Sequence, residues 1–161
     1  MEDKKHLPLY GVGPVYGVTI IIMTVIGIIL SLKGLFNSGQ YDFLKMPFLV
    51  IGIIFIAYGV VIWVSAAMFA KIDANISDNR LVTTGIYAYV RNPLYSSFMI
   101  ACTGAIICFN NLWLLILPII YWGFMTALMR NTEEKWLKDL YGQEYIKYCS
   151  HVNRCIPWFH R

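Results

Sequence analysis

The chain has 161 residues, of which 58% are apolar or aromatic and only 14% are charged. A soluble domain carries roughly 45–50% apolar and about 25% charged residues, so this composition excludes an ordinary water-soluble globule, a disordered chain and a disulfide scaffold. About 20 apolar residues make one bilayer crossing, so four crossings would occupy roughly half of the chain. We therefore expect an all-α, multi-span integral membrane protein with about four transmembrane helices.

The expected spans follow one another along the chain as long apolar regions, at residues 12–32, 47–70 and 94–129. The first region exceeds the core of a signal peptide and has no cleavage site after it, so we interpret it as a retained span. Gly13 and Gly17 lie four residues apart in this region. Their spacing fits either a close helix approach or a loose entry turn around Pro14.

The third apolar region is interrupted by Asn110 and Asn111. Two adjacent amides are costly in hydrocarbon and favourable in a turn, so the region predicts a tight helical hairpin. Each arm has about 16–18 residues, which is at the short end for spanning. Pro118 lies in the second arm, where we expect it to kink the helix.

The positive charges predict an orientation. With four spans, 11 of the 13 Lys and Arg residues fall on one side, and only Lys33 and Lys45 fall on the other. The positive-inside rule then places both termini in the cytoplasm. We expect a single membrane domain over residues 1–161, with two N-terminal spans in 1–70 and the loop, hairpin and cytoplasmic helical tail in 71–161.

Two polar segments, residues 71–93 and 130–161, are expected to meet on the cytoplasmic side. In the first, Asn92 before Pro93 is either the N-cap of the next helix or part of an anion site. Arg91 is either an interfacial anchor or a carboxylate clamp. Tyr87 and Tyr95 suit an aromatic belt, but together these residues justify the hypothesis of a site.

The tail predicts two short amphipathic helices separated by Gly142, the second over residues 143–152. Glu133 and Glu134 stand directly beside the last span, where an acidic pair has no anchoring use, although a solvated helix face would accept it. Arg130 and Glu134 are four residues apart, which allows a surface ion pair.

These two segments carry a family resemblance. The loop reads GIYAYVRNPLY over residues 85–95, and after the hairpin the tail reads R-x-x-E-E-x-x-L-x-x-x-Y-G-x-E-Y over residues 130–145. Together they resemble the integral-membrane methyltransferases of the isoprenylcysteine carboxyl methyltransferase and phospholipid methyltransferase superfamily. The resemblance implies an enzyme that binds S-adenosylmethionine from the cytosol and methylates a lipophilic acceptor, such as an isoprenylcysteine-like carboxylate or another lipid, that enters from the bilayer.

The resemblance also implies roles for individual residues. Arg130 and Glu134 would be catalytic, with Arg130 facing the reacting end. The cofactor would be bound by a larger set, namely Tyr87, Arg91, Asn92, Pro93, Tyr95, Glu133, Glu134, Tyr145 and Tyr148. Asn92 replaces the His of the prenylcysteine enzymes, a variant of bacterial members, which puts prenylcysteine in doubt and implies a bacterial inner membrane.

The remaining expectations concern partners. The four cysteines form no CxxC pair and have no metal-like spacing with the three histidines, so no metal is expected. The basic residues are interleaved with acidic ones, so no nucleic-acid partner is required. The oligomeric state and the acceptor stay open. The alternative function is a non-enzymatic membrane scaffold or lipid-binding protein whose tail senses anionic lipid.

Overall fold

The computed structural model describes residues 12–72 and 81–158. The regular elements in these ranges are all helical, which confirms the all-α fold class. The long helices are α1 (Gly13–Leu32), α2 (Lys45–Ile72), α3 (Pro93–Cys108) and α4 (Ile116–Asn131), and two short helices follow, α5 (Glu133–Tyr141) and α6 (Gln143–His151). Short 3₁₀ turns at Asn37–Gly39, Asp42–Leu44, Gly85–Ala88 and Leu112–Leu115 connect them.

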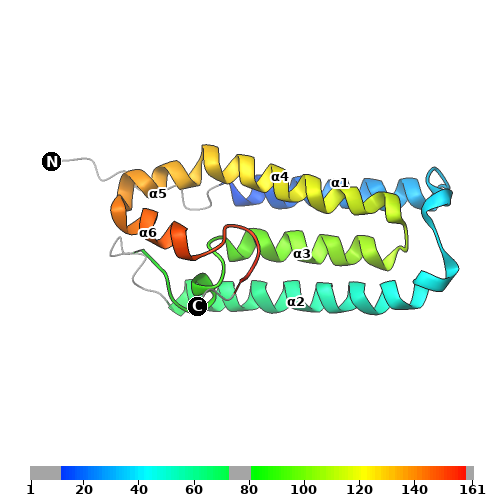
Figure 1. Ribbon diagram of the computed structural model, residues 1–161, viewed down its shortest axis with the longest axis horizontal. Helices are drawn as coiled ribbons and strands as arrows, with labels where there is room; N and C mark the ends of the chain where they lie inside the picture. The colour runs from blue at the N-terminus through cyan, green and yellow to red at the C-terminus, as the bar shows by residue number, and fades with distance from the viewer. Residues whose placement is uncertain (1–11, 73–80, 159–161) are drawn as a thin grey trace.

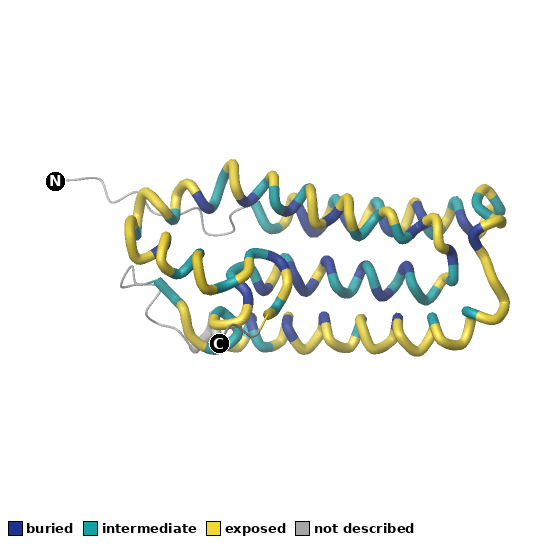
Figure 2. The backbone as a smooth tube through the Cα atoms, in the orientation of Figure 1, coloured by how far each residue is buried: buried dark blue, intermediate teal, exposed yellow. Residues whose placement is uncertain are grey.

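The four long helices lie side by side, with α3 between α2 on one side and α1 with α4 on the other (Figure 1). Three stretches are long and apolar enough to cross a membrane: Gly13–Leu32, Asp42–Met68 and Leu112–Tyr141. Helix α3 has 16 residues and is shorter. Exposed residues follow the outer side of α2 along its length (Figure 2), as expected of a surface in contact with lipid.

Helix α2 packs on α3 through glycines that bring the two backbones together. A Cβ added at Gly52 would stand 2.6 Å from the carbonyl oxygen of Gly104, and one added at Gly59 would stand 2.8 Å from the carbonyl oxygen of Ser97. Small residues at such positions let helices associate by van der Waals contact in a membrane, where no hydrophobic effect drives them together. The glycines therefore determine how closely the edge helix α2 approaches the rest of the bundle.

Gly13 and Gly17 of α1 face α3. A Cβ added at Gly13 would lie 3.2 Å from the hydroxyl oxygen of Tyr95, and one added at Gly17 would lie 3.8 Å from the ring of Phe98. Pro14 occupies the first turn of α1. Gly13 and Gly17 therefore contact side chains of α3 within the chain.

The predicted hairpin is confirmed, with Asn110 and Asn111 between α3 and the turn that leads into α4. Asn110 has a φ of 50°, a left-handed conformation that asparagine tolerates better than most residues. The expected kink at Pro118 is wrong, because α4 begins at Ile116 and Pro118 lies in its first turn. The missing N–H of a proline there deprives the helix of no hydrogen bond.

Buried Asn111 ties the hairpin to the end of α1. Its amide nitrogen donates to Ser31 Oγ at 2.8 Å and to the carbonyl oxygen of Phe36 at 3.2 Å, and its Oδ1 accepts from the backbone N–H of Trp113 at 3.1 Å. An Asn111→Ala variant removes three hydrogen bonds of a buried side chain and leaves the Trp113 N–H without its acceptor, so we expect the free energy of unfolding to fall by about 2 kcal/mol. Thermal unfolding in detergent measures this loss. Ser38→Ala removes only an exposed bond to the Trp113 indole and is the control; an equally large loss there would contradict the prediction.

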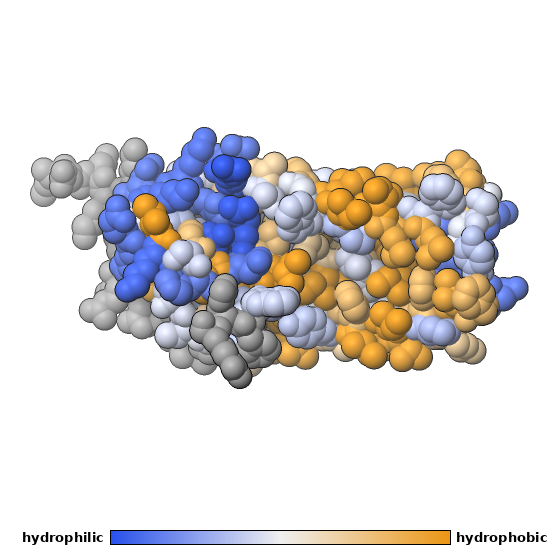
Figure 3. Space-filling model, in the orientation of Figure 1, coloured by the Kyte–Doolittle hydropathy of each residue, from blue (hydrophilic) through white to orange (hydrophobic). Residues whose placement is uncertain are grey.

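The two tail helices are confirmed: α5 continues beyond the end of α4, and α6 turns back toward the bundle (Figure 1). The chain breaks from α4 into α5 at Thr132, which has φ −123° and ψ −92°. It turns again at Gly142, whose φ of 54° favours glycine. Hydrophilic side chains gather over α5 and α6, and apolar side chains cover much of the bundle beyond them (Figure 3). The polar loop and the polar tail therefore meet at one end of the bundle.

Candidate functional site

Glu134 is the centre of the polar end. It occupies the first turn of α5, and only 5% of its side chain is exposed. Arg154 holds it with two parallel bonds, from Nε to Oε1 at 2.5 Å and from Nη2 to Oε2 at 2.9 Å. Arg91 adds a third contact from Nη1 to Oε1 at 3.2 Å. The hydrogen bond and ion pair with Glu134 raise the pKa of Arg154 above its ordinary value. The cluster therefore joins a buried carboxylate to one enclosed guanidinium and to a second, that of Arg154, which is 24% exposed.

Backbone pairing between the loop and the end of the chain brings the two arginines together. Val90 and Asn153 form an isolated parallel bridge, in which the Arg91 N–H donates to the Asn153 carbonyl at 2.9 Å. Further along, the Trp158 N–H donates to the Tyr89 carbonyl at 3.1 Å. Residues 153–158 therefore run across the loop as a strap, and this strap supplies Arg154.

Asn92 fastens the strap. It occupies the N-cap position of α3, as one of the two interpretations predicted, but its side chain caps nothing. The amide nitrogen instead donates to the carbonyl oxygen of Arg154 at 3.1 Å. Pro93 follows in the buried first turn of α3. A proline suits that position, so the short sequence from Arg91 to Pro93 joins the helix start, the strap and the carboxylate cluster.

A cavity of about 440 Å³ opens beside this cluster. It lies between α4, the end of α6 and the strap, and is lined by Arg91, Trp122, Thr126, Cys149, Ser150, His151, Val152, Asn153, Arg154, Cys155 and Trp158. Only 9% of the Arg91 side chain is exposed. Its Nη1 also donates to the Cys149 sulfur at 2.6 Å, but its buried Nε has no partner among the described residues. Arg91 thus belongs to the cavity lining, while its Nε–H is enclosed by the protein.

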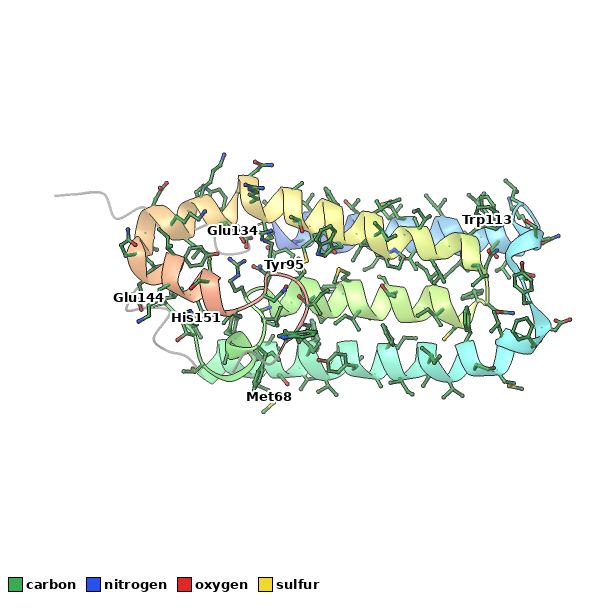
Figure 4. The ribbon with its side chains drawn as sticks, viewed as in Figure 1. Met68, Tyr95, Trp113, Glu134, Glu144 and His151 are labelled. Atoms are coloured by element: carbon green, nitrogen blue, oxygen red, sulfur yellow. The ribbon has the colours of Figure 1, made fainter. Side chains whose placement is uncertain are left out.

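Glu133 faces a different set of groups from its neighbour. Its Oε1 accepts a short hydrogen bond from the Tyr95 hydroxyl and a 2.9 Å bond from the backbone N–H of Val12. Consecutive helical residues point about 100° apart, which explains why one glutamate anchors the start of α1 while the other meets the two arginines. Figure 4 shows Tyr95 and Glu134 at the same end of the bundle, far from Trp113.

The predicted tyrosines of the tail pack behind the cluster. Tyr145 is buried, Tyr148 donates to the Tyr87 carbonyl at 2.6 Å, and the centroids of the Tyr145 and Tyr148 rings are 6.2 Å apart. Burial raises the pKa of both hydroxyls above the ordinary value, so both stay neutral. These rings join α6 to the loop.

Arg130 lies outside this arrangement. It is exposed on the last turn of α4, and the expected pair with Glu134 is wrong, since the partners of Glu134 are Arg91 and Arg154. The break at Thr132 turns α5 away from the axis of α4, so the four-residue spacing does not place the two side chains on one helical face.

Several groups at the site had no predicted role. Arg154 is the most important, and the others are Trp122, Thr126, Cys149, Asn153 and Cys155. Arg154 could have been suspected as a cation after the second tail helix. The rest carry no local signal, because only the return of the strap makes them neighbours. All four cysteines are free thiols, and burial raises the pKa of the Cys155 thiol, which keeps it protonated.

The fold and the site define an integral membrane protein whose polar, arginine-lined cavity lies at one end of an apolar helical bundle. The phospholipid methyltransferase family model matches residues 45–144, and the chain belongs to that family. The matched region runs from the start of α2 into α6. The resemblance carried by the loop and tail motifs is thereby confirmed.

The relatives match about half of the chain. A protein-S-isoprenylcysteine O-methyltransferase of Schizosaccharomyces pombe is 37% identical over 81 residues, which are 50% of this chain and 34% of the relative. The enzyme of that name from Saccharomyces cerevisiae is 36% identical over 83 residues, or 51% and 34%. Methanethiol S-methyltransferase 1 of Bradyrhizobium diazoefficiens is 35% identical over 80 residues, or 49% and 27%. The matches thus span about a third of these relatives. No solved structure matches the chain significantly.

Proposed function

We propose that this chain transfers a methyl group from S-adenosylmethionine to a lipophilic acceptor at the cytoplasmic face of a membrane. The observation that carries the proposal is Arg91, a buried guanidinium that lines the 440 Å³ cavity with an unpartnered Nε. Family membership and the names of the relatives, which methylate oxygen or sulfur, give the reaction class.

The residues of the cavity fit this cofactor. Arg91 lines the cavity and offers the positive charge of its guanidinium to the carboxylate of the methionine part. The indoles of Trp122 and Trp158 offer flat apolar surfaces for the adenine or the sulfonium. Bound there, S-adenosylmethionine supplies an activated methyl group. We assign cofactor binding to Arg91, which lines the cavity. Asn92, Pro93 and Glu134 have the proposed role of holding Arg91 and the strap in place, and Tyr87, Tyr145 and Tyr148 support this arrangement.

Glu134 has a positioning role in this proposal. It holds both guanidiniums in place and leaves Arg91 Nε free, and Arg154 in turn fastens the strap over the cavity. Methyl transfer is an in-line displacement, so alignment and exclusion of water are what such a wall contributes. Glu133 and Tyr95 support the start of α1. Arg130 is exposed in the last turn of α4, and its proposed role is to contact the headgroup of the acceptor.

The alternative of a lipid-sensing scaffold treats the acidic pair as surface charge. The burial of Glu134 between two guanidiniums fits a built site better, because removing the Glu134 carboxylate and the Arg91 guanidinium from water is costly. The orientation, with loop and tail in the cytoplasm, rests on the distribution of Lys and Arg.

Calorimetric titration of the purified chain with S-adenosylhomocysteine tests the cofactor, and incubation with methyl-labelled S-adenosylmethionine and total membrane lipid tests the transfer. We expect saturable binding and a labelled lipophilic product. Arg91→Ala is expected to weaken binding by at least about 100-fold, because a charge-assisted pair in a buried site is lost. Absence of binding by a folded wild-type sample would refute the proposal.

A further inference from the structure

The second half of the strap is apolar, although it belongs to the polar end of the molecule. Residues 155–158 read Cys-Ile-Pro-Trp and follow Arg154 directly. Ile156 is 49% exposed and Trp158 is 64% exposed. Whether water or lipid surrounds these two side chains depends on the depth of the strap relative to the spanning helices.

The contacts of Cys155 indicate this depth. Cys155 is 1% exposed and belongs to the buried apolar cluster of the long helices, together with Tyr16 of α1 and Cys102 of α3. Its sulfur lies 3.8 Å from Thr126 Oγ1 of α4. Thr126 precedes Arg130 by four residues, which is about 6 Å along a helix. The strap therefore dips about one helical turn from the charged end of α4 into the apolar bundle.

The exposed side chains of the strap continue the lipid-facing surface of α4. Trp158 lines the cavity together with Trp122, which lies about two turns before Arg130 on α4. Trp122 is exposed, as are its apolar neighbours Ile119 and Ile120. Figure 1 shows the strap, in red, turning back over the bundle after α6. In the same orientation, Figure 3 shows this position where the hydrophilic surface over α5 and α6 gives way to apolar surface.

The backbone of residues 155–158 is suited to a medium without water. The N–H groups of Cys155 and Ile156 donate to Asn153 Oδ1 at 3.0 and 3.1 Å. The Trp158 N–H donates to the Tyr89 carbonyl oxygen at 3.1 Å, and the proline between them has no N–H. Each N–H of this stretch therefore has a partner within the protein, which irregular backbone requires at membrane depth because lipid offers no acceptors.

We propose that residues 155–158 are inserted into the bilayer at the boundary between headgroups and acyl chains, where Ile156 and Trp158 contact lipid. Tryptophan is common at this boundary, because its indole contacts alkyl chains and its N–H stays at the polar side. The partner of this surface is the phospholipid bilayer itself. The proposal goes beyond the proposed function and requires no bound cofactor.

Insertion gives the strap a second anchor. On the protein side, Glu134 holds the Arg154 guanidinium and Asn92 holds the Arg154 carbonyl oxygen. On the lipid side, the apolar residues that follow Arg154 gain contact with acyl chains, which stabilises burial in proportion to the apolar area removed from water. The cavity that the strap borders then opens beside the lipid surface.

Fluorescence quenching in nanodiscs tests the location of Trp158. The full chain is placed in phosphatidylcholine whose acyl chains are brominated near the headgroup, and the emission of Trp158 is the difference between the wild type and Trp158→Phe. We expect brominated lipid to remove most of this emission, because bromine quenches only on close approach. Trp63 is the positive control, measured with Trp63→Phe, since it is 48% exposed in α2 within a span. Equal emission of Trp158 in brominated and ordinary lipid would overturn the inference.

A charge at Ile156 gives a second measurement that does not depend on Trp158→Phe. Ile156→Asp places a carboxylate against lipid, so the midpoint of thermal unfolding in nanodiscs should fall by at least about 3 °C. Ile146→Asp is the matched control, because Ile146 is 48% exposed on α6; we expect a change within about 2 °C. Equal falls in the two variants would contradict the insertion. Failure of the wild type to bind S-adenosylhomocysteine would refute the proposed function and leave this inference standing.

Discussion

Replacing Glu134 with glutamine is expected to cause the largest loss at the polar end of the molecule. Glutamine keeps the volume and removes the charge, so the enclosed Arg91 and the partly exposed Arg154 are left side by side without their shared counter-ion. Breaking a buried ion pair by removing one partner typically costs about 3–5 kcal/mol of folding stability. Because Glu134 also loses two parallel bonds from Arg154, we expect a loss in the upper part of this range. We expect a lower thermal midpoint in detergent.

The same substitution should disturb the cavity. Arg154 would no longer be fixed, and Asn92 would hold a strap that has lost its main anchor. We expect the affinity for S-adenosylhomocysteine to fall by at least about 100-fold, equivalent to about 2.7 kcal/mol. Calorimetry at a temperature where the variant is folded measures this loss.

Glu133→Gln is the matched control for Glu134→Gln. It neutralises the adjacent residue on the same helix, but its partners are the Tyr95 hydroxyl and the backbone N–H of Val12, which are neutral donors that an amide oxygen still satisfies. We expect affinity for S-adenosylhomocysteine within about threefold of the wild type. Equal losses of affinity in the two variants would show that the paired glutamates act together and would contradict the separate roles that their contacts indicate.

Adding a single methyl group at Gly52 is expected to separate α2 from the bundle. In Gly52→Ala the new Cβ would meet the Gly104 carbonyl oxygen at 2.6 Å and the Cys108 sulfur at an even shorter distance. The carbonyl belongs to the backbone of α3 and cannot rotate away, so the helices must move apart along their contact. Overpacking of a close contact typically costs 1–3 kcal/mol, and a clash with backbone belongs at about 3 kcal/mol.

Gly123→Ala provides the control, because Gly123 lies in α4 and a Cβ there meets nothing within 4 Å. Alanine is the better helix former by about 1 kcal/mol, so this variant should be as stable as the wild type or more so. The midpoint of thermal unfolding in detergent should therefore fall for Gly52→Ala and stay the same or rise for Gly123→Ala. Cys108→Ala in combination with Gly52→Ala should rescue little, since the carbonyl of Gly104 remains; a full rescue would show that only the sulfur was in the way.

The sequence by itself determined the helical elements and the family. An apolar run of sufficient length must be satisfied by its own backbone hydrogen bonds in lipid, so composition alone predicts helices there. Asn110 and Asn111 predicted the hairpin, and Gly142 predicted the break between the two tail helices, because these residues favour turns by their own local chemistry. The loop and tail motifs also indicated which two segments to examine.

Only the tertiary structure decided which charges meet. Spacing along one helix suggested that Arg130 pairs with Glu134, but the break at Thr132 ends that helix and the strap brings Arg154 from 20 residues further on. Asn92 occupies the N-cap position of α3, as the sequence suggested, but its side chain donates a hydrogen bond to the Arg154 carbonyl oxygen in the strap. Helix and turn signals act between near neighbours, whereas a buried ion cluster depends on how separate segments pack, and the pairing of Val90 with Asn153 that assembles it leaves no periodic pattern in the sequence.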